Sequence, residues 1–308
     1  MTTTPPPTTG PHATDVVVIG GGPAGLQAAL TIGRVHRRVV LFDDGRYRNG
    51  TVAHMHNVAS HDGTAPAAFR ATARAELAAY DTVEVREQRV VSTQVLGGGG
   101  IRVTVANGST LTAGALVLAT GLRDTLPAVD GLDALWGDLV AACPFCHGHE
   151  AAGRRIGILG AAAAPHLSRL LGPVAGSLVV LPHEEPSPEG LPDDVEVVMG
   201  QVVHAARVDG EIELTLADGA TERVAALFVS PRFEQAAPFA EQLGLDLNPS
   251  GCVRIDELGR TSVAGVSAGG DLAHLAALPM PMVSVVQAMA GGQMAASGAL
   301  MGLLAAAT

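Results

Sequence analysis

Hydrophobic residues near the start of the chain follow the order that a strand, a helix and a second strand require. The continuous apolar run DVVVI at 15–19 is typical of a strand buried on both faces of a sheet. It leads through GGGPAG into LQAALTIGRV, whose composition favours a helix, and the next apolar run, VVLF at 39–42, ends in Asp43. This order predicts a βαβ unit.

The glycine-rich turn of this unit matches the dinucleotide-binding pattern G-x-G-x-x-G. The first glycine makes the tight turn, the second lets a pyrophosphate approach the backbone, and the third lets the helix pack on the strand. The helix N-terminus offers N–H donors to a phosphate, and an acid about 20 residues further on accepts from a ribose hydroxyl. The candidate binding residues are Gly20, Gly22, Pro23, Ala24, Gly25 and Asp43.

Alternating positions at 83–118 predict short strands joined by glycine-rich turns, which we interpret as a β-meander inserted into the first domain. ALVLATG at 115–121 predicts another buried strand. A second strand–turn–helix–strand pattern begins at Arg155, but its turn, GAAAAP, keeps only Gly160. Ala162 replaces the glycine that permits pyrophosphate approach, and the second strand ends in PHEE without an arginine for a 2′-phosphate. We predict a structural domain that binds no nucleotide.

The last third of the chain contains an apolar strand that ends at Gly270 and Asp271, followed by a stretch without charged side chains at 283–308. Its length admits a membrane span. Serine, glutamine and glycine residues interrupt it, and basic or aromatic anchors do not flank it. A buried helix of a soluble core explains it better.

Composition limits the functions to consider. The chain has 308 residues, 47% of them hydrophobic, a net charge of −11 and no arginine-rich run, so nucleic acid and anionic membranes are not expected partners. Three cysteines are too few for a secreted disulfide framework. The polar, proline-rich start does not match a signal peptide. We expect a disordered tail at 1–13 and a cytoplasmic location.

The motif CPFCHGHE at 143–150 is open to three interpretations. C-x-x-C-H matches a haem-attachment signal, which normally requires export. Zinc would need Cys143, Cys146, His147 and His149 together, and a second ligand pair at the usual spacing is missing. A redox-active disulfide needs only the two cysteines, because C-x-x-C brings two sulfurs within bonding reach and lowers the thiol pKa. We favour the disulfide, expect no metal, and take Cys252 as a buried structural thiol.

GGGPAG at 20–25, ATG at 119–121, CPFC at 143–146 and GGD at 269–271 occur in an order that resembles the low-molecular-weight thioredoxin reductase family of flavoproteins. The resemblance implies an α/β fold with two Rossmann-like, three-layer ββα nucleotide-binding domains and a homodimer. It implies a discontinuous FAD-binding domain at 14–126 plus 233–308, and a degenerate NADPH-type domain at 127–232 that carries the C-x-x-C motif.

The resemblance also assigns cofactor contacts. Asp43 would bind the adenosine ribose of FAD, Asp271 the ribityl chain, and Gln287 would begin the helix that points at the flavin ring. The remaining positions carried over are Arg48, Asn57, Val90, Ala119, Thr120, Gly121 and Gly270. His54 and His56, beside Asn57, fit either the flavin pocket or a plain loop.

Two departures from the reductases, the broken second fingerprint and His147 after the second cysteine, resemble the FAD-dependent dithiol oxidases of natural-product pathways. These enzymes need no NADPH and pass electrons from a small dithiol to O2. A substrate thiolate would attack Cys143, the second substrate thiol would release the product disulfide, and Cys146 would pass electrons to the flavin, with peroxide as the other product. His147 is our first candidate base, and His149 and Glu150 would orient it.

Two other functions remain open. One is a disulfide reductase supplied by ferredoxin or by an unusual use of NADPH. The other is a flavin-based redox sensor that does not turn over.

Overall fold

The computed structural model describes residues 12–306, which form two compact units. Unit 1 comprises the described parts of Met1–Arg48, Ala67–Arg123 and Phe233–Thr308, and unit 2 comprises Asn49–Pro66 and Asp124–Arg232. We predicted 49–66 within the FAD-binding domain, but the segment groups with unit 2, where Thr51 packs against Gly137. The tail expected at 1–13 lies, up to residue 11, outside the described residues. Ala13 already donates a backbone hydrogen bond to Thr112 O at 3.2 Å.

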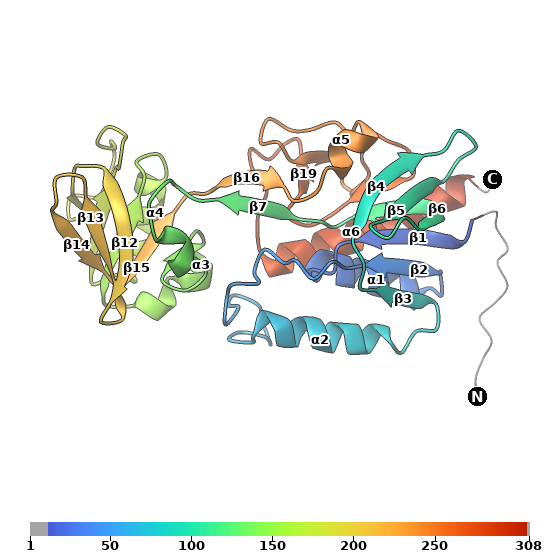
Figure 1. Ribbon diagram of the computed structural model, residues 1–308, viewed down its shortest axis with the longest axis horizontal. Coiled ribbons are helices and arrows are strands. Elements are labelled where there is room, and N and C mark those ends of the chain that lie inside the picture. Colours follow the sequence, from blue (N-terminus) through green and yellow to red (C-terminus); the bar gives the residue numbers. More distant parts are fainter. Residues whose placement is uncertain (1–11, 307–308) are drawn as a thin grey trace. The chain divides into compact units, whose positions relative to one another are not determined.

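Unit 1 is built on one largely parallel sheet (Figure 1). The strand order is β3–β2–β1–β6–β5–β4, and β18 also pairs with β6. β1 lies parallel to β2 and β6, whereas β4, β5 and β6 are antiparallel. The strands are β1 (Thr14–Ile19), β2 (Val39–Phe42), β3 (Val83–Arg86), β4 (Val90–Val95), β5 (Ile101–Val105), β6 (Thr110–Leu118) and β18 (Val266–Ala268).

The sheet has a hydrophobic core on each face because successive side chains of a strand point to opposite sides. Val16 and Val18 of β1 pack in the core under the helices, and Val17 and Ile19 pack in the core on the other face. This arrangement explains why DVVVI is apolar at every position after its aspartate. The three layers agree with the predicted Rossmann-like fold.

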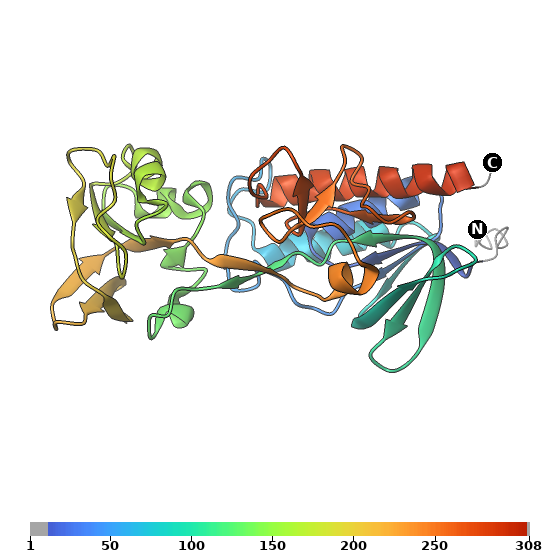
Figure 2. The ribbon, with the colours of Figure 1, turned by 90° about the horizontal axis from the view of Figure 1, so that it is seen from above.

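Three helices complete the core of unit 1. They are α1 (Pro23–Arg34), α2 (Pro66–Leu77) and α6 (Val285–Ala306). Helices α1 and α6 pack directly against each other, and α6 also contacts β6 and β18 (Figure 2). The close approach of α6 requires small residues: a Cβ at Gly292 would overlap the backbone of Ala24.

Helix α6 is long and apolar enough to cross a membrane by length and composition alone. We predicted a buried helix, and the structure buries one face only. Ala288, Ala295 and Ala299 pack into the core, while Met294 and Met301 are 40% and 51% exposed. The alanine and glycine face fits the narrow space beside α1, Leu300 and Leu303 also pack against the core, and the methionines lie on the other face.

Unit 2 repeats the strand–helix–strand pattern. β9 (Arg155–Leu159), α4 (Ala164–Leu171) and β10 (Ser177–Leu181) form the predicted second βαβ-like unit. The parallel sheet has the order β11–β10–β9–β15–β8, and an antiparallel sheet has the order β12–β13–β14. The other elements of this unit are β8 (Val140–Ala141), α3 (Pro144–His147), β11 (Glu196–Val197), β12 (Val202–Val208), β13 (Glu211–Leu216), β14 (Thr221–Val224) and β15 (Ala226–Val229), with short 3₁₀ turns at Leu132–Leu135 and His149–Ala151.

The remaining elements are two short strand pairs and one helix. The pairs are β7 (Leu122–Thr125) with β16 (Arg232–Gln235), and β17 (Val253–Ile255) with β19 (Ala273–Leu275), and the helix is α5 (Phe239–Leu243).

The predicted meander at 83–118 needs one correction. β3 pairs in parallel with β2, with Val39 opposite Val83, so only β4, β5 and β6 form the meander. The strand predicted at 115–121 is the second half of β6. Its first half pairs with β5 and its second half with β18, which a linear pattern of hydrophobicity does not distinguish.

Candidate active site

The first glycine turn has the geometry of a phosphate-binding loop. Gly20 follows β1 with a φ of 116°, and a Cβ there would overlap the carbonyl of Ala119. A Cβ at Gly25 would overlap the Gly20 carbonyl oxygen, so α1 packs here only because this position is glycine. At Gly22, in contrast, a Cβ would meet no described atom within 4 Å. The turn therefore leaves open space at the start of α1, where N–H donors and the helix dipole favour an anion.

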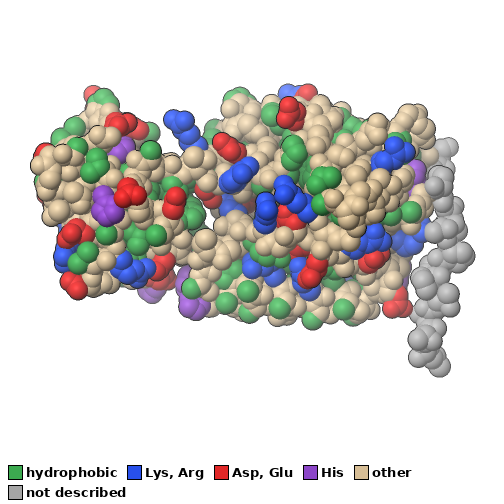
Figure 3. All heavy atoms as spheres, viewed as in Figure 1, with side chains coloured by type: hydrophobic (Ala, Val, Ile, Leu, Met, Phe, Trp, Pro, Cys, Tyr) green, Lys and Arg blue, Asp and Glu red, His purple; other side chains and the backbone are tan. Residues whose placement is uncertain are grey.

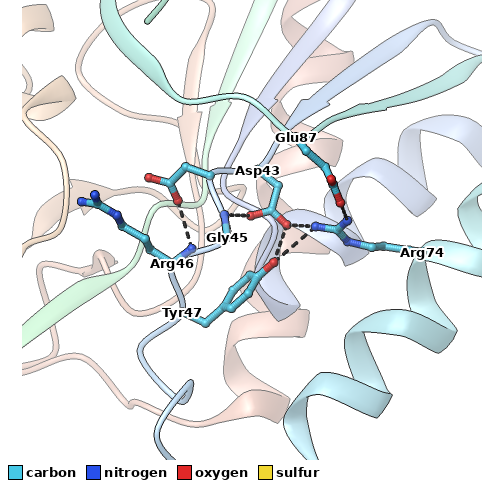
Figure 4. Close-up of polar contacts among 7 residues, drawn as sticks. Asp43, Gly45, Arg46, Tyr47, Arg74 and Glu87 are labelled. Carbon is cyan, nitrogen blue, oxygen red and sulfur yellow. Dashed lines mark hydrogen bonds and ion pairs between the residues drawn. The ribbon is translucent and has the colours of Figure 1, made fainter.

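Asp43 lies at the end of β2 against this turn, as the fingerprint requires (Figure 4). Its side chain is 1% exposed. One carboxylate oxygen accepts from Gly45 N at 2.9 Å, and the other accepts from Tyr47 Oη at 2.7 Å and from Arg74. A Cβ at Gly21 would overlap this carboxylate, so the acid and the turn are in direct contact.

Arg74 and Tyr47 belong to a polar cluster that sequence reasoning missed. Arg74, on α2, also pairs with Glu87 Oε1 at 2.6 Å. Burial opposes the charge of Arg74, but the carboxylates of Glu87 and Asp43 raise its pKa above the usual value. Burial and the hydrogen bond to Asp43 raise the pKa of Tyr47. Arg70 stacks on the Tyr47 ring, 3.7 Å from its centroid.

A second acid, Asp271, follows β18 and lies next to the same turn. Gly270 has a φ of 90°, and a Cβ there would lie 2.8 Å from the Ala24 Cβ. The adjacent Asp271 pairs with Arg48 Nη1 at 2.9 Å, and Arg48 stacks on Phe233 at 5.0 Å. Asp271 and the glycine turn are therefore neighbours, although they are far apart in the sequence.

The other predicted cofactor residues of unit 1 lie on the same sheet or on α6. Val90 begins β4, and Ala119, Thr120 and Gly121 follow the carboxyl end of β6. Gln287 lies in the first turn of α6. An open glycine turn with two acids beside it fits the phosphates and hydroxyls of FAD. Asn57 is different, because it lies in the segment that groups with unit 2.

The second glycine turn is filled by a side chain of the protein itself. Gly160 follows β9 with a φ of 101°, as Gly20 follows β1. The carboxylate oxygen Oε2 of Glu185 accepts hydrogen bonds from Ala161 N at 2.9 Å and Ala162 N at 3.2 Å. These are N–H groups that a nucleotide phosphate would need. A nucleotide phosphate at this turn would compete with the Glu185 carboxylate for these N–H groups.

The C-x-x-C motif contains a disulfide. Cys143 is joined to Cys146, with their Cα atoms 5.3 Å apart. Cys143 precedes α3, Pro144 begins the helix, and Cys146 N donates to Cys143 O at 3.2 Å. Phe145, between the two cysteines, is 65% exposed. The third thiol, Cys252, is buried in unit 1, and burial raises its pKa.

The predicted base is close to the motif and shielded from water. His147 is the last residue of α3, and its Nδ1 atom is buried without a hydrogen-bond partner among the described residues. Burial lowers the pKa of His147, and Glu150 partly opposes this shift. His147 is therefore neutral near pH 7 and able to accept a proton. His149 is exposed to solvent.

His56, for which the sequence suggested either the flavin pocket or a plain loop, joins this group. His56 Nε2 lies 3.4 Å from Glu150 Oε1, and His56 Nδ1 lies 3.5 Å from Asp62 Oδ1. The sequence offers no signal for this approach, because His56 and Glu150 are 94 positions apart (150 − 56 = 94). Among residues 12–306, His, Cys, Asp and Glu side chains form no group of three that could hold a metal ion.

Two dinucleotide-type units, an open glycine turn and a disulfide next to a histidine define a disulfide oxidoreductase of the flavoprotein type. A family model of the pyridine nucleotide-disulphide oxidoreductases matches residues 14–163 and 191–296, and the chain belongs to this family.

Similar proteins and solved structures are consistent with this family assignment. Thioredoxin reductase sirT of Leptosphaeria maculans is 34% identical over 94% of this chain and 94% of its own length. A probable thioredoxin reductase of Arthroderma benhamiae is 41% identical, but over only 50% of this chain and 40% of its length. Among solved structures, HlmI is 33% identical with a TM-score of 0.82, covering 95% of this chain and 93% of that one. The thioredoxin reductase-like fold predicted from the sequence is therefore confirmed.

Proposed function

We propose that this protein is an FAD-dependent dithiol oxidase that forms an intramolecular disulfide in a small natural-product dithiol and reduces O2 to hydrogen peroxide. The observation that carries the proposal is the contrast between the two glycine turns. The turn at Gly22 is open to a dinucleotide, whereas the turn at Ala162 is occupied by Glu185. Electrons would therefore enter from a dithiol rather than from NADPH.

The thiol chemistry follows from the Cys143–Cys146 disulfide. A substrate thiolate attacks Cys143, forms a mixed disulfide and releases Cys146 as a thiolate. The second substrate thiolate then attacks the substrate sulfur of the mixed disulfide, so the product leaves as a disulfide and Cys143 leaves as a thiolate. Two electrons have moved from the substrate to the cysteine pair, and two thiol protons have been lost.

Bound FAD would accept this electron pair from the reduced cysteines and pass it to O2. His147 is the candidate base for the substrate thiols, because it is neutral near pH 7 and adjacent to Cys146. His149 and Glu150 would orient it. Imidazole accepts a proton and releases it again in the range where thiols exchange.

The charge at the second turn supports the proposal that NADPH is not the electron donor. A carboxylate already uses the N–H groups of Ala161 and Ala162, and it would repel a phosphate brought to the same place. Glu184 and Glu185 follow β10, where a 2′-phosphate would need an arginine.

The expected partners are a small dithiol, O2 and a second copy of the chain. The exposed Phe145 offers an apolar contact next to the disulfide, which suits a small molecule. The exposed Met294, Met301 and Leu304 of α6 support a dimer face. Acidic and basic side chains are interspersed on the face shown in Figure 3, which gives no support for a nucleic-acid partner.

A second candidate is a disulfide reductase that receives electrons from NADPH or ferredoxin. It is supported by the names of the relatives, which include thioredoxin reductases.

One anaerobic experiment separates the two functions. The purified flavoprotein is mixed with either NADPH or dithiothreitol, and the visible flavin absorbance is followed. The oxidase predicts bleaching by dithiothreitol alone, with recovery and peroxide formation when air is admitted. Fast bleaching by NADPH would instead support the reductase. Cys143→Ser and Cys146→Ser should abolish bleaching by dithiothreitol, and the matched control Cys252→Ser should preserve it.

A further inference from the structure

We infer that His56 is a positioning residue of the disulfide-exchange site: its imidazole bridges Asp62 and Glu150 and holds the Glu150 carboxylate beside the C-x-x-C motif. The inference rests on the proposed exchange chemistry at Cys143, but it concerns a residue that lies far from the motif in the sequence. All of these residues belong to unit 2.

The bridge is a chain of one imidazole and two carboxylates. Nε2 of His56 lies 3.4 Å from Glu150 Oε1, and Nδ1 lies 3.5 Å from Asp62 Oδ1. The His56 side chain is 25% exposed, while those of Glu150 and Asp62 are 44% and 67% exposed. Both ring nitrogens therefore face an acid.

The backbone around His56 fixes the direction of the ring. The preceding residue, Met55, is 5% exposed and forms an antiparallel bridge with Thr64. The following residue, Asn57, has a φ of 59° and donates its N–H to Asp62 Oδ1 at 2.8 Å. Asp62 thus contacts both the backbone next to His56 and the His56 ring. Because the backbone on each side of His56 is already held by hydrogen bonds, fixing the direction of the ring costs little additional conformational entropy.

The charges around His147 show why the position of Glu150 matters. Glu150 and Asp138 favour the protonated form of His147, and His56 disfavours it. The backbone of Gly137 also hydrogen-bonds to His147. A Glu150 carboxylate paired with His56 presents less negative charge to the motif than an unpaired one. Loss of His56 therefore leaves an unpaired acid four residues after Cys146 (150 − 146 = 4), and a negative charge near the motif makes the thiolate less stable.

Each turnover releases two thiol protons while one electron pair moves to the cysteine disulfide. The pKa of the Cys143 thiol should therefore respond to the charge of Glu150, which His56 holds in place. This quantity can be measured without O2, NADPH or a natural substrate.

The test is the pH dependence of Cys143 alkylation in the reduced, FAD-loaded protein, with iodoacetamide as the probe and peptide mass spectrometry as the readout. His56→Gln should raise the midpoint by roughly half a pH unit, which is about a threefold loss of thiolate below the midpoint. In a Glu150→Gln background the same substitution should have almost no effect, because the carboxylate that His56 holds beside the motif has been removed. His54→Gln, an exposed neighbour, is the matched control and should leave the midpoint unchanged.

Three results would overturn the inference. They are a His56→Gln profile equal to that of His54→Gln, a shift in the opposite direction, and an undiminished shift in the Glu150→Gln background. Asp62→Asn, at an exposed side chain, provides a second route if His56→Gln does not fold. It should move the midpoint in the same direction by less, and an unchanged midpoint there would equally overturn the inference. Bleaching by NADPH would reject the oxidase function without changing any of these outcomes.

Discussion

The ion pair between Arg74 and Asp43 should contribute strongly to the stability of unit 1, because the Asp43 carboxylate is buried. Arg74→Met keeps most of the side-chain volume and removes the charge. It leaves a carboxylate that is 1% exposed and that, among residues 12–306, keeps hydrogen bonds from Tyr47 Oη at 2.7 Å and Gly45 N at 2.9 Å. Removing one partner of a fully buried pair costs about 3–5 kcal/mol.

Two features of this pair reduce the expected loss. Arg74 is 26% exposed, so water compensates for part of the loss, and the two remaining donors still satisfy the acid. We therefore expect about 2 kcal/mol. For a unit of this size that corresponds to a fall in Tm of roughly 4–8 °C.

The measurement is differential scanning calorimetry of the flavin-free protein, with Glu87→Gln as the matched control. Glu87 also pairs with Arg74, at 2.6 Å, but its side chain is 78% exposed. Exposed pairs contribute about 0–1 kcal/mol. If the two variants lowered Tm equally, burial of Asp43 would not be the source of the stability, and the reasoning would be refuted.

Three further predictions follow from single positions. Burial lowers the pKa of folded His147, so the unfolded chain binds the proton more tightly and stability falls as the pH drops below about 6.5. His147→Gln should remove that part of the acid sensitivity, seen as a flatter dependence of the urea midpoint on pH, and an unchanged slope would contradict it. Gly25→Ala should lose bound flavin, measured as the flavin-to-protein ratio, because its Cβ would overlap the Gly20 carbonyl oxygen; full flavin content would refute the packing argument. Glu185→Ala should lower the unfolding free energy by about 1 kcal/mol in urea titrations, since two N–H groups lose their acceptor, whereas the exposed Glu189→Ala should not.

The local patterns that sequence reasoning used were short and strongly constrained. The run DVVVI, the glycines at 20, 22 and 25, and Asp43 occupy consecutive parts of one βαβ unit. The residue type at each of these positions is restricted by steric contacts with residues nearby in the chain, which is why the pattern predicted the turn correctly. The loss of the fingerprint at Ala162 was visible for the same reason.

The interpretation was weakest where the outcome depended on which strands pair. β3 has the alternating pattern of a meander strand, yet it extends the parallel sheet beside β2. The helix at 285–306 has no charged side chain, and only its packing against α1 decides which face is buried.

The sequence alone determined the two βαβ units, the open turn at Gly22 and the paired cysteines of the motif, because each depends on interactions between near neighbours along the chain. Only the tertiary structure decided that Glu185 fills the second turn, that Arg74 neutralises Asp43, and that His56 lies against Glu150. These contacts join residues 23 to 94 positions apart in the chain (185 − 162 = 23; 150 − 56 = 94). Their formation depends on how sheets and loops pack, and charges acting through space carry no periodic signal in the sequence.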